Sequence, residues 1–407
     1  MHVLFVEPAF PKTQREHVRA LHAVGARVTG IGERSPEALD PELRSWLDGY
    51  EQVRSVVDEA ALEAAVRRVQ ARGWVDRLET TVEAHVLPVA HVRERCAIPG
   101  TSVRTAFLCR DKAAMKHALR EAGVPCAAST GASDGASIRE FARRVGYPVI
   151  VKPLAAAGAA GAMRADDDAQ LEAAIAQHGV DRGQAVAVEE FIDGHEGFWD
   201  TVSIGGHVLH EFVCHYYPNV LEAMRTRWIS PQIVCTNRVE LDSYRELREL
   251  GRKVLGVLGI ETSATHMEWF FGAKGLKFSE IGCRPPGVGV WDLYSAANEI
   301  DLYSEWAKAV VHGRSDARLS RRYACGMIAL RPDRDGRIVR YDGLEAMRQR
   351  YGSAIVKEYF PPPGTATQGV ENGYHANAWL VLRHPDYDTL RGMLDDVGRT
   401  VKVRAQG

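Results

Sequence analysis

The pattern of hydrophobic and polar positions along the chain predicts alternating strands and helices at the N-terminus. An apolar run, His2 to Val6, precedes a segment rich in His, Arg, Ala and Leu, and a second apolar run, ARVTGIGE, follows. A strand, a helix and a strand in this order typically form a βαβ unit with a parallel sheet. Segment 53–73 repeats the alternation, 79–95 predicts a helix, and the turn at 98–100 is expected to close a first domain.

A hairpin pattern lies at residues 265–287, THMEWFFGAKGLKFSEIGCRPPG, where two runs of aromatic and branched residues flank a Gly-Ala-Lys-Gly turn. Pairing across this turn opposes Phe270 with Phe278, Glu268 with Glu280 and His266 with Gly282. Opposed Cβ atoms lie about 4.5–5.5 Å apart, and like charges there are destabilising. The two glutamates are therefore expected to hold a cation, and Mg²⁺ suits one or two carboxylates plus phosphates and water. The alternative is a solvated face that holds nothing.

Composition and charge narrow the classes of function. The 407 residues predict two or three domains, and 45% hydrophobic with 26% charged residues is typical of a soluble globular protein. A formal net charge of -2 gives no indication of nucleic acid or an anionic membrane as partner. The N-terminal apolar run is too short for a signal peptide, and no stretch reaches the ~18 apolar residues of a membrane span. Cysteines without CxxC spacing are expected to be reduced thiols in a cytoplasmic protein.

Two lysines and a loop are candidates for binding an anion. Asp111 is expected to cap the helix DKAAMKHALREAG, and Lys112 lies in its first turn, where the helix dipole disfavours a cation. Lys152 lies in the apolar strand YPVIVKP, although lysine is rarely buried without a partner. The next loop, LAAAGAAGAM, contains Gly158 and Gly161 among small residues that let backbone N–H groups approach phosphate. Alternatively, Lys112 is a plain surface residue and the loop a flexible tip.

Two further segments carry candidate binding residues. The strand that ends in Glu-Glu-Phe-Ile before DGHEG can offer backbone groups to an adenine edge, with Glu196 on ribose hydroxyls; the alternative is a surface turn. Segment 212–237 is predicted to be a long aromatic and basic connection, and long loops in compact domains are usually functional. Candidate substrate selectors, which could equally be packing between domains, are Arg225, Arg227, Trp228, Trp291 and Asp292.

Five segments in this order resemble the ATP-grasp superfamily, and within it the carboxylate–amine ligase branch that includes L-amino-acid ligases. They are RDKAAMKHALREAGVPC, GYPVIVKPLAAAGAAGAM, VEEFIDGHEG, THMEWF and EIGCRPPG. The resemblance covers most of the chain and implies an α/β fold in three parts. These are an N-terminal parallel domain at 1–105, ATP-grasp domains with antiparallel sheets at 106–312, including a lid near 126–192, and a small C-terminal α+β domain at 313–407.

The resemblance implies how ATP would be bound. Lys112 and Lys152 match lysines that contact the ATP phosphates, and Gly158–Gly161 matches the lid over the β- and γ-phosphates. The positions that match adenine and ribose contacts are Glu189, Phe191, Ile192 and Glu196.

The resemblance also implies a metal site. Glu268 and Glu280 match carboxylates that hold two Mg²⁺ ions, for which Mn²⁺ is an alternative, and Arg284 matches an arginine near the transferred phosphate. His266 fits the Thr-His-x-Glu pattern of the ligase branch. One departure is Gly282, which stands where the family has an asparagine that serves as a third metal ligand. Water or substrate fills that position, or the second ion binds more loosely.

The implied activity is an ADP-forming ligation of a small carboxylate to an amine through an acyl phosphate, with amino acids as the expected substrates. Two alternatives stay open: a carboxylase-type or other acyl-phosphate enzyme with a different nucleophile, and a non-catalytic nucleotide-binding sensor. The sequence identifies neither substrate nor a general base, and it leaves a homodimer open.

Overall fold

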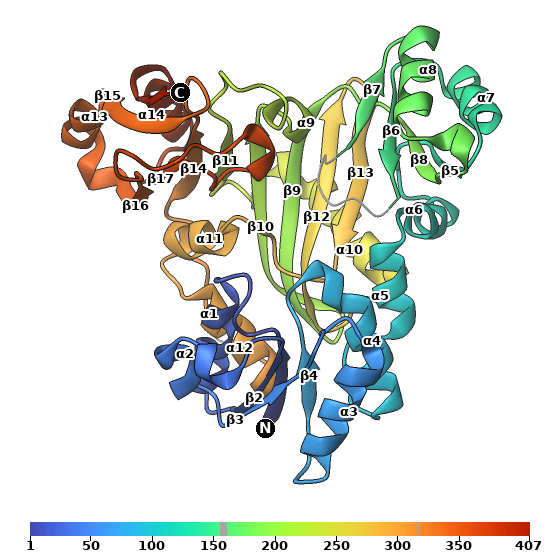
Figure 1. Ribbon diagram of the computed structural model, residues 1–407, viewed down its shortest axis with the longest axis vertical. Coiled ribbons are helices and arrows are strands. Elements are labelled where there is room, and N and C mark those ends of the chain that lie inside the picture. The colour runs from blue at the N-terminus through green and yellow to red at the C-terminus, as the bar shows by residue number, and fades with distance from the viewer. Residues whose placement is uncertain (155–160, 316) are drawn as a thin grey trace.

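A computed structural model describes residues 1–154, 161–315 and 317–407, and Figure 1 shows the N-terminal residues as a separate layer at one end of the molecule. Their sheet has the order β3-β2-β1-β4 and is parallel throughout, which confirms the predicted N-terminal architecture. The strands are β1 (His2–Val6), β2 (Arg27–Gly32), β3 (Gly49–Gln52) and β4 (Arg77–Glu79). The helices that cover this sheet or follow it are α1 (Gln14–Ala23), α2 (Pro41–Ser45), α3 (Glu59–Gln70), α4 (Val86–Arg95) and α5 (Val103–Arg110).

The predicted helix at 79–95 is wrong in its first part. Glu79 ends β4, a 3₁₀ turn follows at Glu83–His85, and α4 begins only at Val86. The parallel pairing of β4 with β1 accounts for the difference, because backbone groups at 77–79 are used by the sheet.

A small antiparallel sheet, with the order β5-β8-β6-β7, follows in the region predicted as a lid. Its strands are β5 (Ser129–Ala132), β6 (Val149–Pro153), β7 (Met163–Ala165) and β8 (Val186–Glu190), and the nearby helices are α6 (Lys112–Glu121), α7 (Gly135–Val145) and α8 (Asp168–Gln177). The side chain of Asp111 accepts the backbone N–H of Ala114, as expected of an N-cap.

The centre of the molecule is an eight-stranded sheet of order β13-β12-β9-β10-β11-β14-β17-β16, antiparallel at every pairing (Figure 1). Its strands are β9 (His195–Ile204), β10 (His207–Tyr217), β11 (Gln232–Cys235), β12 (Ser263–Gly272), β13 (Gly275–Gly282), β14 (Ala324–Leu330), β16 (Ile355–Tyr359) and β17 (Ala378–His384). The remaining elements are α9 (Val220–Ala223), α10 (Arg245–Leu258), α11 (Val290–Asn298), α12 (Leu302–His312), α13 (Leu344–Tyr351), α14 (Tyr387–Thr400) and the ribbon of β15 (Arg337–Asp342) and β18 (Lys402–Gln406).

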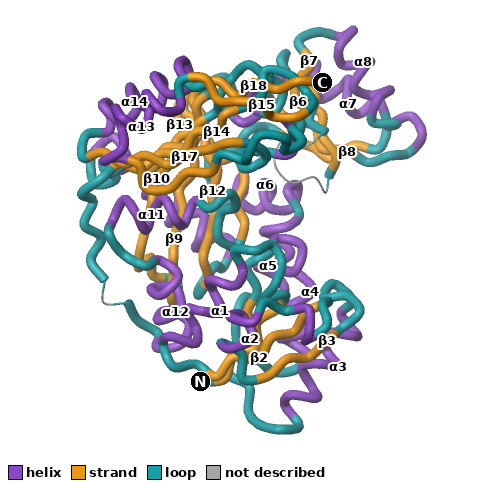
Figure 2. The backbone as a smooth tube through the Cα atoms, turned by 60° about the vertical axis from the view of Figure 1, so that its left-hand side comes forward, coloured by secondary structure: helices purple, strands orange, loops and turns teal. Residues whose placement is uncertain are grey.

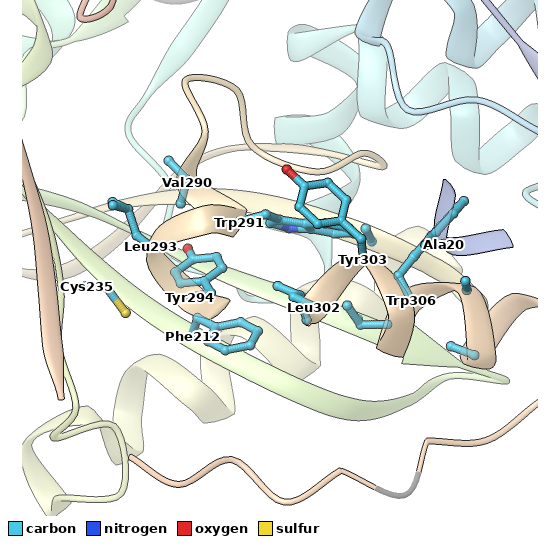
Figure 3. Packing of buried hydrophobic residues seen from close by; sticks show 14 of the residues in the cluster. Ala20, Phe212, Cys235, Val290, Trp291, Leu293, Tyr294, Leu302, Tyr303 and Trp306 are labelled. Atoms are coloured by element: carbon cyan, nitrogen blue, oxygen red, sulfur yellow. The ribbon is translucent and has the colours of Figure 1, made fainter. Parts of the chain in front are cut away.

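Both faces of this sheet are covered by helices. On one face α10 buries Leu247, Val254 and Leu258, which recur at helical spacing, as an apolar stripe requires. On the other face Tyr294 of α11 stacks on Phe212 of β10 with ring centroids 4.1 Å apart (Figure 3). These layers hold the β12–β13 hairpin at the edge of the sheet nearest the small sheet (Figure 1).

One further expectation from the sequence is corrected. The segment 212–237 is not one long connection, because its ends belong to β10 and β11. Two separate helices, α11 and α12, follow the hairpin: Glu299 adopts a left-handed conformation after α11, and Asp301 caps α12. The C-terminal strands β14, β17 and β16 continue the central sheet beyond β11, while β15 and β18 pair at the far end from the N-terminal sheet (Figure 2). The expected boundary at 312/313 therefore falls in a link between elements of one sheet-sharing unit.

Among the helices in the described ranges, none combines the length and the apolar character that crossing a membrane requires.

Gly197 provides a test of the packing. A Cβ atom at Gly197 would lie 2.4 Å from the Trp269 ring and 2.5 Å from the Cys214 carbonyl oxygen, whereas one at Gly131 would meet no atom within 4 Å. We expect Gly197→Ala to lower the free energy of unfolding by about 1–3 kcal/mol, because overpacking forces the strands apart. Gly131→Ala, the control in β5, should change it by less than about 0.5 kcal/mol. Urea unfolding of both variants measures the difference, and equal effects would contradict the close approach.

Candidate active site

A cavity of about 570 Å³ lies between the small sheet and the β12–β13 hairpin. We call it the large cavity. Sequence-predicted residues from both sides line it, namely Lys152, Glu189, Phe191, Ile192, Glu196, Arg225, Glu268 and Glu280. The structure thus brings together most of the residues expected to contact a nucleotide, although they are up to 128 positions apart in the chain.

The two glutamates of the hairpin face each other as the sequence predicts. Glu268 is paired with Glu280, and His266 with Gly282. The predicted pairing of Phe270 with Phe278 is wrong, because a bulge after Glu268 shifts the register and places Trp269 opposite Phe278. Because the extra residue comes after the Glu268–Glu280 pair, the two carboxylates stay on one face. The aromatic residues beyond the bulge change their cross-strand partners.

A third carboxylate completes an acidic group at this end of the cavity. Glu196 of β9 is buried, and its Oε2 accepts the backbone N–H of Val220 at 2.7 Å. Burial, together with the negative charge of Glu268 and then of Glu280, raises the pKa of Glu196 to about 8. The raised pKa shows that a third negative charge beside Glu268 and Glu280 is unfavourable without a cation, so binding of a cation would favour the ionised form of Glu196.

The hairpin carboxylates fit Mg²⁺ as far as their chemistry is concerned. They supply hard oxygen donors from adjacent strands, and Mg²⁺ commonly takes one or two carboxylates and completes its shell with phosphate and water. In the described part of the chain, no group of three or more His, Cys, Asp or Glu side chains is arranged to hold a metal by itself. Such a site would depend on a phosphate ligand for the rest of its coordination.

The two lysines expected to contact phosphate are held by carboxylates. Lys112 forms an ion pair with Glu280, and although burial alone would lower its pKa, the Glu280 carboxylate holds that pKa above the ordinary value. Lys152 Nζ lies 2.7 Å from Glu189 Oε2, and burial lowers the pKa of Lys152. The cation in the first turn of α6 thus has a partner on the hairpin, and the lysine in the apolar strand has one on the neighbouring strand β8.

Lys116 is a residue that the sequence analysis missed. It is only 1% exposed, and its Nζ lies 2.7 Å from Oε1 of Glu189, so Glu189 bridges Lys116 and Lys152. Burial acts to raise the pKa of Glu189, but the two ammonium groups outweigh it and the pKa falls to about 2. The available signal was its position beside Met115 in the stripe that α6 buries, where a lysine requires a partner.

The adenine-contacting positions expected from the sequence lie around the end of β8. Phe191 donates its backbone N–H to Pro148 at 3.1 Å, and the Arg164 guanidinium lies 4.2 Å from its ring centroid. The side chain of Glu189 lies on the two lysines, so only its backbone remains for a base. Gly161 has φ +71°, which suits glycine, while Gly158 lies outside the described residues.

His266 is held by a buried chain of polar groups. Its Nδ1 lies 2.8 Å from Asp200 Oδ1, directly across the strand pair, and Tyr294 donates to Asp200 Oδ2 at 2.5 Å. Burial would lower the pKa of His266, but the Asp200 carboxylate raises it to about 9. The raised pKa makes His266 a cation at neutral pH, with Nε2 3.6 Å from Glu268 Oε1.

Arg284 is joined to the N-terminal domain through Glu83. Its Nε donates to Glu83 Oε2 at 2.7 Å, and Arg110 Nη1 lies 3.0 Å from Glu83 Oε1. A Cβ atom at Gly282 would lie 2.9 Å from Glu83 Oε2. Glycine at this position therefore leaves room for the Glu83 carboxylate, which occupies the space beside Arg284 that an asparagine side chain would enter.

The expected substrate selectors do not gather in one place. Arg225 donates to the Ala162 carbonyl oxygen and lines the large cavity. Arg227 pairs with Asp335 at 2.6 Å, and Trp228 is 89% exposed. Trp291 and Asp292 lie at the start of α11: Trp291 is buried among aromatic residues, and Asp292 Oδ2 lies 3.0 Å from Lys357 Nζ.

Comparison with known proteins matches one segment of this chain to a family model and larger parts of it to two bacterial proteins. Residues 111–197 match the model of the carbamoyl-phosphate synthase L chain, ATP binding domain. An uncharacterized protein, y4rH, of Sinorhizobium fredii is 23% identical over 344 residues, covering 83% of this chain and 70% of that protein. The L-arginine-specific L-amino acid ligase of Bacillus subtilis is 24% identical over 269 residues, covering 65% of this chain and 64% of the ligase.

A solved structure extends the likeness to the whole fold. The L-amino acid ligase from Bacillus licheniformis has a TM-score of 0.78 and 17% identity, covering 100% of this chain and 99% of that one. The chain has the fold of an ATP-grasp protein, and residues 111–197 match an ATP binding domain of that kind. The chain is similar to the carboxylate–amine ligases, L-amino acid ligases among them.

The His266–Asp200 pair predicts a pH dependence of stability. Because the pKa of His266 is raised from 6.5 to about 9, its stabilisation is fully present below about pH 6.5 and lost as the pH rises through about 9. We expect Asp200→Asn to flatten the fall in the free energy of unfolding between about pH 6 and 10. Urea unfolding of parent and variant at about pH 6 and pH 10 measures this change. If the free energy of unfolding falls equally with pH in both proteins, the His266–Asp200 pair is not its cause.

Gly282 predicts a second result. Gly282→Asn should lower the free energy of unfolding by about 1 kcal/mol, because the new side chain displaces a carboxylate held by two arginines. In a Glu83→Ala background the same substitution should cost clearly less. Unfolding of the four proteins of this cycle gives the coupling, and purely additive costs would show that Glu83 and position 282 do not meet.

Proposed function

We propose that this protein is an ADP-forming carbon–nitrogen ligase that joins the carboxylate of one amino acid to the amine of another. The observation that carries the proposal is the facing pair Glu268 and Glu280 in the large cavity, with Lys112 paired to Glu280 and Lys152 in the lining of the same cavity. This arrangement provides carboxylates for a metal on one side and ammonium groups for phosphates on the other. The fold-wide likeness to L-amino acid ligases supports the same reaction class.

The reaction proceeds in two steps. A carboxylate oxygen of the first substrate attacks the γ-phosphorus of ATP, the bond to the bridging oxygen breaks, and ADP leaves. The amine nitrogen of the second substrate then attacks the acyl carbon, phosphate leaves with the bonding electron pair, and the nitrogen loses a proton. Phosphoryl transfer asks the protein chiefly for positioning and charge neutralisation.

The lysines supply part of that charge by exchanging partners. Lys112 moves from Glu280 to phosphate oxygens, which frees the Glu280 carboxylate for a metal ion. Lys152 moves in the same way from Glu189, while the more deeply buried Lys116 stays and keeps Glu189 neutralised. Mg²⁺ held by Glu268 and Glu280 would neutralise charge on the β- and γ-phosphates.

The other residues of the large cavity hold the nucleotide and the intermediate. Phe191, Ile192 and the backbone of Glu189 contact adenine, and Glu196 contacts ribose. Arg284, fixed by Glu83, directs its guanidinium at the transferred phosphate. The cationic His266 steadies the negative charge of Glu268 next to that phosphate.

The test is release of ADP and phosphate from MgATP, with no amino acid, with single amino acids and with pairs. Release that needs a pair, together with a product carrying a new amide bond by mass spectrometry, supports the ligase. Release with one carboxylate and a nucleophile other than an amine favours a carboxylase-type enzyme. Nucleotide binding without release under any of these conditions overturns the proposal in favour of a sensor.

Glu280→Gln tests the metal-binding role. This variant should lose about a hundredfold or more in turnover, because one carboxylate facing the phosphates is gone. Its gain in melting temperature on adding Mg²⁺ and ADP should also shrink. Without ligands it should be slightly less stable than the parent, because Lys112 loses its charged partner.

The control is Glu172→Gln, which removes a carboxylate from an exposed pair with Arg139. This variant should keep both the activity and the response to Mg²⁺ and ADP. Full activity of Glu280→Gln, or an unchanged response to Mg²⁺ and ADP, would exclude the facing pair as the metal site.

A further inference from the structure

A second cavity, of about 250 Å³, lies between the N-terminal domain and the segment that follows β13. It is defined by three segments: α1 with the turn before it, residues 81–83, and residues 284–303. It is smaller than the ~300–1,000 Å³ of sites for drug-sized ligands, and so suits part of a small molecule.

The second cavity is connected to the proposed site through the residues at the end of β13. Glu280 and Gly282 lie on one face of β13, and Arg284 follows two residues later. Glu280 lines the large cavity and Arg284 lines the second cavity, so the two cavities are joined along the chain by residues 280–284. Arg284 lines it at this end together with Glu83. Nη2 of Arg284 has no hydrogen-bond partner among the described residues, which leaves a donor for a ligand.

Charge is confined to that end. Val82, Trp291 and Tyr303 form apolar and aromatic walls, and the rings of Trp291 and Tyr303 lie 5.1 Å apart (Figure 3). The polar side chains of Gln14 and Thr81 are bonded to each other. A ligand group inside the cavity therefore meets surface that would not compensate the loss of hydration of a charge.

His17 adds one uncharged polar group to this wall. It is 3% exposed, lies among the rings of Trp291, Tyr303 and Trp306 at 5.0–5.2 Å, and burial lowers its pKa to about 3. Among the described residues nothing accepts from or donates to its Nε2. Because both ring nitrogens are also buried, His17 contributes a neutral ring to the wall and does not attract a charge.

We propose that the second cavity binds the side chain of one amino-acid substrate, and that this side chain is bulky, uncharged and largely aromatic or aliphatic. Arg284 and Glu83, with opposite charges, face the charged groups at the α-carbon, and the apolar walls take the side chain. The inference rests on the proposed ligase function and specifies which amino acids it uses.

The walls also set the length of the side chain. Val82 belongs to the half-buried part of the lining, and Thr13 is exposed at the rim, so added bulk at either position enters the cavity without opening the core. Because these positions touch only the side chain, they should change the choice of amino acid and leave ATP binding alone.

The experiment uses the full chain with MgATP, L-alanine as one substrate, and L-alanine, L-leucine, L-phenylalanine, L-tyrosine, L-aspartate or L-lysine as the other. Phosphate release should favour the bulky uncharged amino acids over aspartate and lysine. Val82→Phe should lower the ratio of kcat/KM for L-phenylalanine to that for L-alanine by about tenfold or more, with ADP affinity unchanged. Thr13→Trp is the second variant in case Val82→Phe does not fold, and Val57→Phe, exposed and outside both cavities, is the control.

Calorimetric binding of L-phenylalanine to the protein with MgADP separates the two proposals. If phosphate is never released but L-phenylalanine binds the parent and not the filled variant, the ligase function fails and the inference stands. If release occurs and the phenylalanine-to-alanine ratio is the same in parent and filled variants, the inference is overturned. A preference of the parent for aspartate or lysine also overturns it, as does the absence of both release and binding.

Discussion

Opposite charges face each other across the large cavity, and the arrangement of the molecule around it depends on their balance. The hairpin contributes Glu268 and Glu280, while α6 and β6 contribute three lysines, two of which share Glu189 as their partner. Buried groups of this kind are costly to leave unpaired. The ion pairs that hold Lys112 and Lys152 therefore keep the cavity formed in the absence of ligand, and they supply charge that a polyphosphate can take over.

Much of the fold could be predicted from sequence because its signals are local. The Gly-Ala-Lys-Gly turn and the alternation on either side of it predict the pairing of Glu268 with Glu280, and Asp111 marks the start of α6. The strand β10 was missed for a physical reason. It is buried on both faces from His210 to Tyr216, so the alternation that identifies a half-exposed strand is lost.

The contacts that complete the site could not be predicted in the same way. Glu189 lies 73 positions from Lys116, and Glu83 lies 201 positions from Arg284. Nothing local tells which lysine a buried glutamate will meet, or that a glycine at 282 makes room for a carboxylate from another domain. A single side chain from the N-terminal domain thus positions the arginine of the site, which ties substrate-binding geometry to the docking of that domain.

The continuity of the central sheet has a consequence for how the chain can be divided. The hairpin with the facing glutamates lies at one edge, and β14, β17 and β16 extend the same ladder at the other. A protein that ended before Ala324 would leave β11 with a row of unsatisfied backbone donors and acceptors open to another chain. The C-terminal strands thus act as a cover against edge-to-edge association, and removing them exposes the protein to aggregation even though they lie at the far side of the sheet from the hairpin.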